Sequence, residues 1–419
     1  MADPFAPFPA VGGEPFSSND MRYPLIPWAE SLLAAPFGVE SPFIGAFGQL
    51  IAQQETPVVT VDFPYNINTA YVTPVTVTTG TVTQANSQAV LQTGASSTGS
   101  ASFSSIIAAR YQPGQGKIWR GTGAFLNGAV AGHVSEVGVG DSNDGFFFGY
   151  PNDGATFDGS TFAVVRRQNG ADVEIIPRSA WDNDIAAFDP TFGNVYQIRY
   201  QWLGYGAIRF YIEDPSTGEV VLVHTILYAN KHIIPSIFNP SLPLRAKIAN
   251  VGNTTNLTLL SASMGLYSEG PVDVSGARFS TGNRKSAITT ETSIFTLQNK
   301  ATFQGQTNRG RMHFDSIGSV LSNAVDSQYR IVLNATLGGT PVFNDISTNQ
   351  SIAAVDVAGT TVTGGTELRR GPSSGNFQLS EDLSTLEIKI VPGDTLTFAA
   401  SSFGGAVIPN LTASWREEL

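Results

Sequence analysis

The chain has 419 residues and a formal net charge of −11, and 14% of its residues are charged, against roughly 25% in typical soluble domains. The acidic balance and the lack of any Lys/Arg cluster argue against nucleic-acid binding, because phosphate contacts need clustered basic side chains. The sequence contains no Cys, which excludes disulfides, thiolate chemistry and Cys-ligated metals. It shows neither a long apolar run nor the pattern of a secretory signal, so we expect no transmembrane segment and no signal peptide.

Residues 1–57 are predicted to form an extended N-terminal arm, because they contain five Pro-Phe pairs and little strand or helix pattern. Proline removes a backbone donor and prevents a continuous ladder. The segment is too aromatic for a solvated linker. We therefore expect its aromatic side chains to dock on a partner subunit, or alternatively on the body of the same chain. The predicted docking residues are Phe5, Phe8, Phe16, Tyr23, Trp28, Phe37, Phe43 and Phe47.

Beyond the arm, the fold class is predicted to be all-β, with two antiparallel β-sandwich domains of the jelly-roll or concanavalin-like type. Apolar and polar residues alternate over much of 58–267, with turn signals every 8–14 residues. The strongest hairpin is Val195–Ile226, in which Ile198 and Tyr200 share an apolar face while Arg199 lies on the other. Residues 268–284 are rich in Gly and Ser and predict a linker, and strand texture resumes over 285–419.

Three segments carry a resemblance to a known class of proteins. Gly138–Gly149 (GVGDSNDGFFFG), Phe162–Arg167 and Val195–Ile212 together resemble a β-sandwich module of virion proteins of double-stranded DNA viruses, in phages and large eukaryotic viruses. The likeness covers about residues 90–300 and implies a structural or fibre-like protein without assigned catalytic residues. The hairpin that begins at Val195 also looks like the strand pair of concanavalin-like lectin and laminin-G sandwiches.

Acidic residues give two candidate chemistries. Concanavalin-like β-glucanases place their carboxylates on one strand as Glu-x-Asp-x-x-Glu, and that string is absent, so we expect no enzyme. Asp141, Asn143 and Asp144 could supply oxygen ligands to Ca²⁺, although the same residues commonly form turns through side-chain to backbone bonds. No other cofactor is expected.

Aromatic residues after Gly145 suggest a strand with two buried faces. In a strand, Phe146 and Phe148 share one face and Phe147 lies on the other. Tyr150 is a candidate for the same face as Phe147. Such a segment is either an inner strand or one covered by a neighbouring subunit. Tyr150, Trp181 and Tyr205 are candidates for stacking on sugar rings.

These observations lead to one preferred function and two alternatives. The preferred function is a virion structural protein, a minor capsid, cement, or spike or fibre component, located in the virion. It would form a homo-oligomer and bind capsid proteins through its arm. The first alternative is a glycan-binding module for host attachment, and the second is a polysaccharide-degrading enzyme. We expect no binding of nucleic acid and no transmembrane segment.

Overall fold

The computed structural model of the protein describes residues 54–272, 276–322, 325–373 and 378–418. The predicted docking residues of the arm, Phe5 to Phe47, lie outside the described residues. Strand β1 (Glu55–Asp62) begins within the range predicted for the arm, and it tolerates Pro57 because the pairing register shifts between Pro57 and Val59. In the described part of the chain no helix has the length and apolar character needed to cross a membrane.

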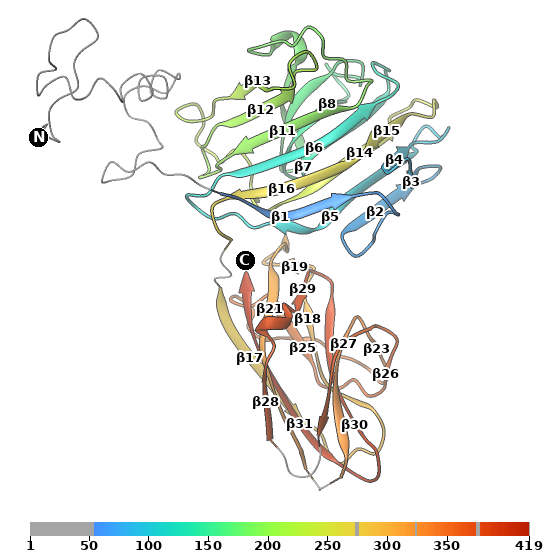
Figure 1. The fold of residues 1–419 in the computed structure, drawn as a ribbon, viewed down its shortest axis with the longest axis vertical. Helices are drawn as coiled ribbons and strands as arrows, with labels where there is room; N and C mark the ends of the chain where they lie inside the picture. Colours follow the sequence, from blue (N-terminus) through green and yellow to red (C-terminus); the bar gives the residue numbers. More distant parts are fainter. Residues whose placement is uncertain (1–53, 273–275, 323–324, 374–377, 419) are drawn as a thin grey trace, which may run out of the picture. The chain divides into compact units, whose positions relative to one another are not determined.

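Two antiparallel sheets form the first β-sandwich (Figure 1). The nine-stranded sheet has a path from one edge to the other, with two further strands attached beside β6. The path is β13 (Val220–Ile226), β12 (Ile208–Glu213), β11 (Asn194–Tyr200), β6 (Lys117–Phe125), β15 (Thr258–Ser261), β4 (Gln88–Gln92) and β3 (Thr81–Ala85). Strand β16 (Ser263–Glu269) pairs with β6, and β1 pairs with β16.

The second sheet of this sandwich has seven strands. Their order is β10 (Ala171–Pro177), β9 (Ala163–Gln168), β8 (Gly145–Tyr150), β7 (His133–Gly140), β14 (Leu242–Asn250), β5 (Ser100–Ala109) and β2 (Val72–Val77). One apolar core lies between the two sheets and takes alternate residues from each strand, as the sequence pattern predicts. Ile198, Tyr200 and Phe210 point into this core.

Two more sheets, with a separate apolar core, form the second β-sandwich. The five-stranded sheet contains β17 (Ala277–Arg284), β31 (Ile408–Glu418), β21 (Arg311–Ser322), β28 (Gln378–Asp382) and β29 (Lys389–Ile390). The six-stranded sheet contains β24 (Asn344–Asp345), β25 (Ala353–Asp356), β18 (Thr292–Asn299), β30 (Thr395–Ser402), β22 (Ser327–Leu333) and β27 (Thr366–Ser373).

Smaller elements complete the described fold. They are the hairpin of β19 (Thr302–Phe303) and β20 (Gln306–Thr307), the pair β23 (Thr336–Leu337) and β26 (Val362–Thr363), and the 3₁₀ turns Arg178–Ala180 and Ser384–Leu386. The all-β class and the antiparallel sandwiches predicted from the sequence are thus confirmed. The predicted linker 268–284 is only partly a connection, because β17 pairs along its whole length with β31. Strand β17 was not predicted, because most of its residues are small or polar.

Candidate functional site

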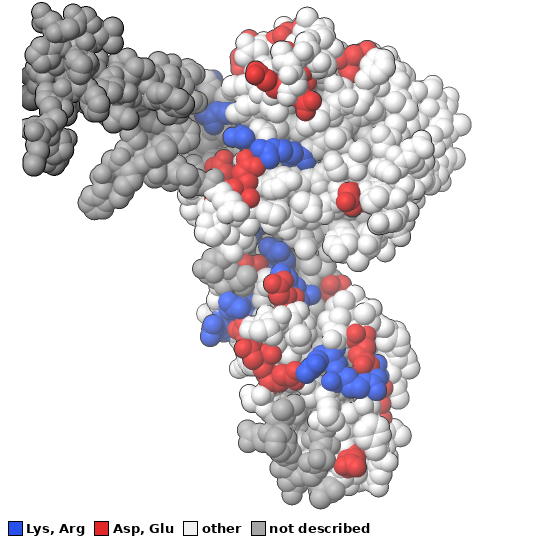
Figure 2. All heavy atoms as spheres, in the orientation of Figure 1, with Lys and Arg blue, Asp and Glu red and all other residues white. Residues whose placement is uncertain are grey.

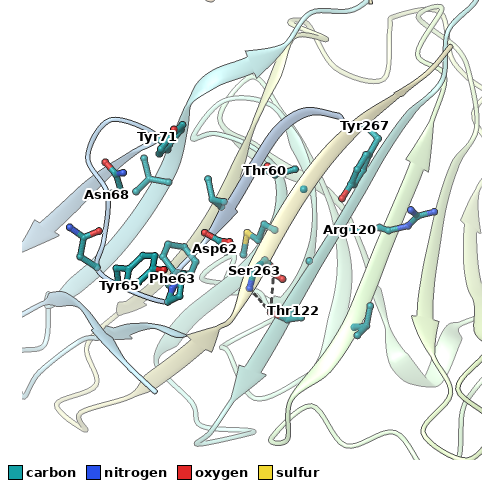
Figure 3. Close-up of a pocket in the computed structure, with 18 residues that line it drawn as sticks. Thr60, Asp62, Phe63, Tyr65, Asn68, Tyr71, Arg120, Thr122, Ser263 and Tyr267 are labelled. Carbon is teal, nitrogen blue, oxygen red and sulfur yellow. Dashed lines mark hydrogen bonds between the residues drawn. The ribbon is translucent and has the colours of Figure 1, made fainter. Parts of the chain in front are cut away.

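An open groove of about 610 Å³ lies on the outer face of the nine-stranded sheet. Strands β1, β16, β6 and β11 form its floor, and the loop 63–71, between β1 and β2, forms one wall (Figure 3). This face carries the side chains that alternate with the buried core residues of the same strands. Cross-strand register places them in rows, so that Thr60 is opposite Gly265 and Asp62 is opposite Ser263.

The floor of the groove is shaped by a residue without a side chain. A Cβ atom on Gly265 would come within 2.7 Å of the Tyr267 hydroxyl and 2.9 Å of its ring. Glycine at this position therefore lets the Tyr267 ring lie over its own strand. Beside it, the Thr122 hydroxyl accepts hydrogen bonds from the amides of Ala262 and Ser263, at 2.8 and 3.1 Å, and fixes the approach of β16 to β6.

The loop that forms the wall is held at both ends. Phe63 is buried, and its ring meets that of Phe103 edge-on with centroids 5.4 Å apart. At the other end, the Asn68 side chain accepts a hydrogen bond from the amide of Ala70, and its carbonyl accepts from the amides of Tyr71 and Val72. A short loop whose polar groups form hydrogen bonds with its own backbone keeps a defined shape.

This anchored loop presents two tyrosine rings to solvent. Tyr65 is 90% exposed and Tyr71 is 55% exposed, and both line the groove together with Asp62 and Asn66. In Figure 3 Tyr65 lies beside Phe63, while Tyr267 and Arg120 lie at the far end of the groove. The groove therefore combines exposed aromatic rings with hydrogen-bonding side chains along an open path.

Charged side chains continue this face away from the loop. Arg120 donates two hydrogen bonds to Glu55, at 2.6 and 2.9 Å, and a third from Nε to the Gln197 side chain at 2.6 Å. Its guanidinium also lies 5.5 Å from the centre of the Tyr267 ring. These bonds hold Arg120 in place at the groove edge.

The outer face of the seven-stranded sheet differs, and this sheet contains two of the three segments that carry the virion resemblance, Gly138–Gly149 and Phe162–Arg167. Strand β8 is an inner strand between β7 and β9, which is one of the two arrangements that the sequence left open. Phe146 and Phe148 enter the core, whereas Phe147 lies on the outer face and is nevertheless fully buried. Tyr150 belongs to the core with Phe146 and Phe148, which corrects its placement beside Phe147.

Glycines in the GVGDSNDGFFFG segment make room for the Phe147 ring. A Cβ on Gly138, Gly140 or Gly145 would approach that ring to 3.0, 2.7 or 2.5 Å. The Arg167 guanidinium covers the ring at 4.8 Å from its centre. Three of the four glycines in this segment therefore lie against the Phe147 ring, whereas a Cβ on Gly149 would instead come within 1.9 Å of the Ser135 carbonyl oxygen.

Arg167 is itself part of a buried ionic cluster. It donates to Glu136 at 2.8 Å and to Asp172 at 2.7 Å, and Arg245 donates to the other Glu136 oxygen at 2.8 Å. Burial alone would raise the pKa of the Glu136 carboxyl, but Arg167 and Arg245 outweigh it and hold that pKa well below its usual range.

The three residues predicted to stack on sugar rings do not come together at one exposed site. Tyr150 and Trp181 are 4% and 9% exposed and pack in the core. Their rings are therefore not available to a sugar. Tyr205 is 40% exposed, and its hydroxyl donates to the carbonyl of Ile233, away from the groove residues. The sequence analysis did not single out the groove residues Tyr65, Tyr71 and Tyr267, although two of them lie in a loop with one Pro and two Asn (PYNINTAY) that signals an exposed turn.

The candidate calcium residues satisfy backbone amides. Asp141 Oδ1 accepts from the amides of Asn143 and Asp144, at 2.7 and 3.0 Å. The Asp144 carboxylate accepts from the amides of Phe238 and Asn239. The Asp141 bonds are the turn chemistry that the sequence left open as the other explanation, whereas the Asp144 bonds join distant parts of the chain. Within the described residues no group of three or more His, Asp or Glu side chains could hold a metal ion, and calcium stays a prediction.

No family model matches the sequence, and no curated protein matches it either. Solved structures do resemble the chain over about half its length. Endo-1,3-β-glucanase from Streptomyces sioyaensis is 11% identical, covers 52% of this chain and 97% of its own, and has a TM-score of 0.37. A β-1,3-glucanase from Mycobacterium marinum is 14% identical, with 50% and 98% covered and a TM-score of 0.33. Lectin I-B4 from Griffonia simplicifolia is 11% identical, with 50% and 99% covered and a TM-score of 0.32.

These comparisons correct one prediction. We expected from the missing Glu-x-Asp-x-x-Glu string that the chain is not an enzyme, and this expectation is contradicted, because an endo-1,3-β-glucanase and a β-1,3-glucanase are among the similar structures. Similarity at this level concerns the fold alone and assigns no reaction to this chain.

Proposed function

We propose that this protein binds carbohydrate in the groove on the outer face of its nine-stranded sheet. The observation that carries the proposal is the pair of exposed tyrosines, Tyr65 and Tyr71, on an anchored loop beside Asp62 and Asn66. Large aromatic rings exposed to water are unfavourable, because burying apolar surface lowers the free energy. A ligand with an apolar face would bury these rings.

Sugars match this combination of groups. One side of a pyranose ring presents C–H groups that pack on an aromatic face, while its hydroxyls need donors and acceptors at the ring edge. Asp62 supplies acceptors, Asn66 supplies both kinds of group, and the Tyr65 and Tyr71 rings supply the faces. Because the groove is open, it suits a stretch of an oligosaccharide better than a single enclosed sugar.

A glycan-binding role and a virion role were both predicted from the sequence. A carbohydrate recognition domain and a lectin occur among the similar structures, but their likeness carries no weight here and the proposal depends on the groove. The predicted virion role, with capsid partners, a docking arm and a homo-oligomer, stays a prediction, because no comparison bears on it.

Calorimetric titration of the full chain against a panel of neutral oligosaccharides tests the proposal. We expect a saturable ligand whose affinity falls about tenfold for each of Tyr65→Ala and Tyr71→Ala, because each ring loses its stacking and buried area. Phe192→Ala is the matched control, since Phe192 is 70% exposed and does not line the groove. Absence of any binding, or equal losses in the control, would contradict the proposal.

A further inference from the structure

Two arginines face each other on the same sheet, next to the groove. Arg199 on β11 and Arg209 on β12 are directly paired across the two antiparallel strands. Their neighbours Ile198, Tyr200, Ile208 and Phe210 all point into the core, so both arginines belong to the outer face. Like charges directly opposite each other on neighbouring strands are unfavourable for folding.

Little negative charge compensates this pair among the described residues. The nearest carboxylate, Glu55, is 3.7 Å from Arg199, but both of its oxygens already accept closer hydrogen bonds from Arg120. Arg209 is exposed and makes no ion pair with any described residue. Arg199 Nε is buried and has no hydrogen-bond partner in the described part of the chain.

The arginines also form part of a larger cationic band that leads to the groove. Cross-strand register places Arg199 beside Ile118 on β6, and Ile118 beside Tyr267 on β16. Arg120, which lines the groove, is two residues further along β6. Figure 2 shows Lys and Arg side chains gathered over β12, β11 and β6 on the drawn face. This band is notable in a chain whose net charge is −11.

Building on the proposed function, we infer that the carbohydrate is anionic and that Arg199 and Arg209 bind its acidic groups. The guanidinium fork matches the geometry of a carboxylate or a sulfate, and two opposed forks can share one such group. Tyr211 strengthens the site, since the Arg199 guanidinium lies 5.6 Å from the centre of its ring and is partly shielded from water. The acidic group would be the carboxylate of a uronic acid or a sulfate ester.

Binding of three hexasaccharides to the full chain at low salt tests this inference: neutral cellohexaose, hexagalacturonate as the carboxylate probe, and a heparin-derived hexasaccharide as the sulfate probe. We expect at least one anionic probe to bind about tenfold or more tightly than the neutral one, as a charge-assisted hydrogen bond would give. That preference should disappear in Arg209→Gln and weaken as salt is added. The tighter of the two anionic probes identifies the acidic group.

Stability separates a binding role from a structural one. Because the pair is mutually repulsive, Arg209→Gln should leave the unfolding midpoint unchanged or raise it while anion affinity falls. The matched control is Arg278→Gln, since Arg278 is exposed on β17 in the other sandwich and its side chain is 76% exposed. This control should retain the preference for the anionic probe.

Four outcomes would overturn the inference or separate it from the proposed function. If the neutral and anionic probes bind equally and both depend on Tyr65, the anionic preference is wrong and the groove stands. If the anionic probes bind through Arg209 without any effect of Tyr65→Ala, the arginine site stands and the groove proposal is wrong. If none of the probes binds, or if Arg209→Gln lowers the unfolding midpoint and leaves the preference intact, the inference is wrong.

Discussion

The two outer faces of the first sandwich use their polar residues in opposite ways. On the seven-stranded sheet, Glu136, Arg167 and Arg245 bond to one another and are nearly buried. On the nine-stranded sheet, Arg199 and Glu55 are more than a third exposed, and Tyr65 and Tyr71 stand in solvent. The first face satisfies its own groups, as a structural surface does. The second face leaves aromatic rings and guanidinium groups exposed to solvent, where a ligand can contact them. We therefore propose that the ligand binds to this face.

The largest expected effect lies on the satisfied face. Glu136→Gln would leave the buried Arg245 guanidinium without a counter-charge and leave Arg167 with Asp172 alone, and it should lower the free energy of unfolding by about 3 kcal/mol. Urea unfolding of the full chain measures this loss. The exposed Glu219→Gln serves as the control and should change stability by less than about 0.5 kcal/mol. A loss as small as the control's would show that the cluster adds nothing to the fold.

The same cluster predicts a dependence on pH. Because the pKa of Glu136 is lowered in the folded protein, its stabilising effect is fully present above the ordinary pKa of a Glu carboxyl, near 4.5. It is lost progressively as the pH falls from there toward the lowered value. The stability difference between the wild type and Glu136→Gln should therefore shrink below about pH 4.5. A difference that stays constant between pH 7 and pH 3 would contradict this explanation.

A smaller effect is expected from the ring that this cluster covers. Phe147→Leu keeps an apolar side chain but leaves part of the space between Gly138, Gly140 and Gly145 unfilled and removes the contact with Arg167. We expect a loss of about 1–2 kcal/mol in the free energy of unfolding. Phe192→Leu, on an exposed ring, is the control and should be nearly neutral. Equal stability of Phe147→Leu and wild type would rule out the close packing described for this ring.

The smallest effect on stability is expected on the open face. Glu55→Gln weakens an ion pair whose partners are more than a third exposed, and such pairs contribute about 0–1 kcal/mol. Binding should respond differently, because the loss of Glu55 removes the carboxylate that competes for Arg199 and Arg120. We expect hexagalacturonate to bind more tightly to this variant in calorimetric titrations. A stability loss as large as that of Glu136→Gln would erase the contrast between the two faces.

Local pattern predicted much of the fold but not the groove. Alternation placed Ile198 and Phe210 in the core, and period 2 separated Phe147 from Phe146, because these faces depend only on neighbours in sequence. The groove instead depends on the pairing of β1 with β16, whose residues are about 200 positions apart. Local alternation says nothing about such a pairing. The aromatic character of Trp181 likewise suggested a surface role, because its burial depends on distant residues.

A crystal structure of the full chain soaked with the tightest oligosaccharide tests the central claim most directly. We predict sugar rings packed on Tyr65 and Tyr71, with hydroxyls bonded to Asp62 and an acidic group at Arg199 and Arg209. A saccharide bound on the seven-stranded face, over Arg167 and Glu136, would contradict this account, as would one bound to the second sandwich.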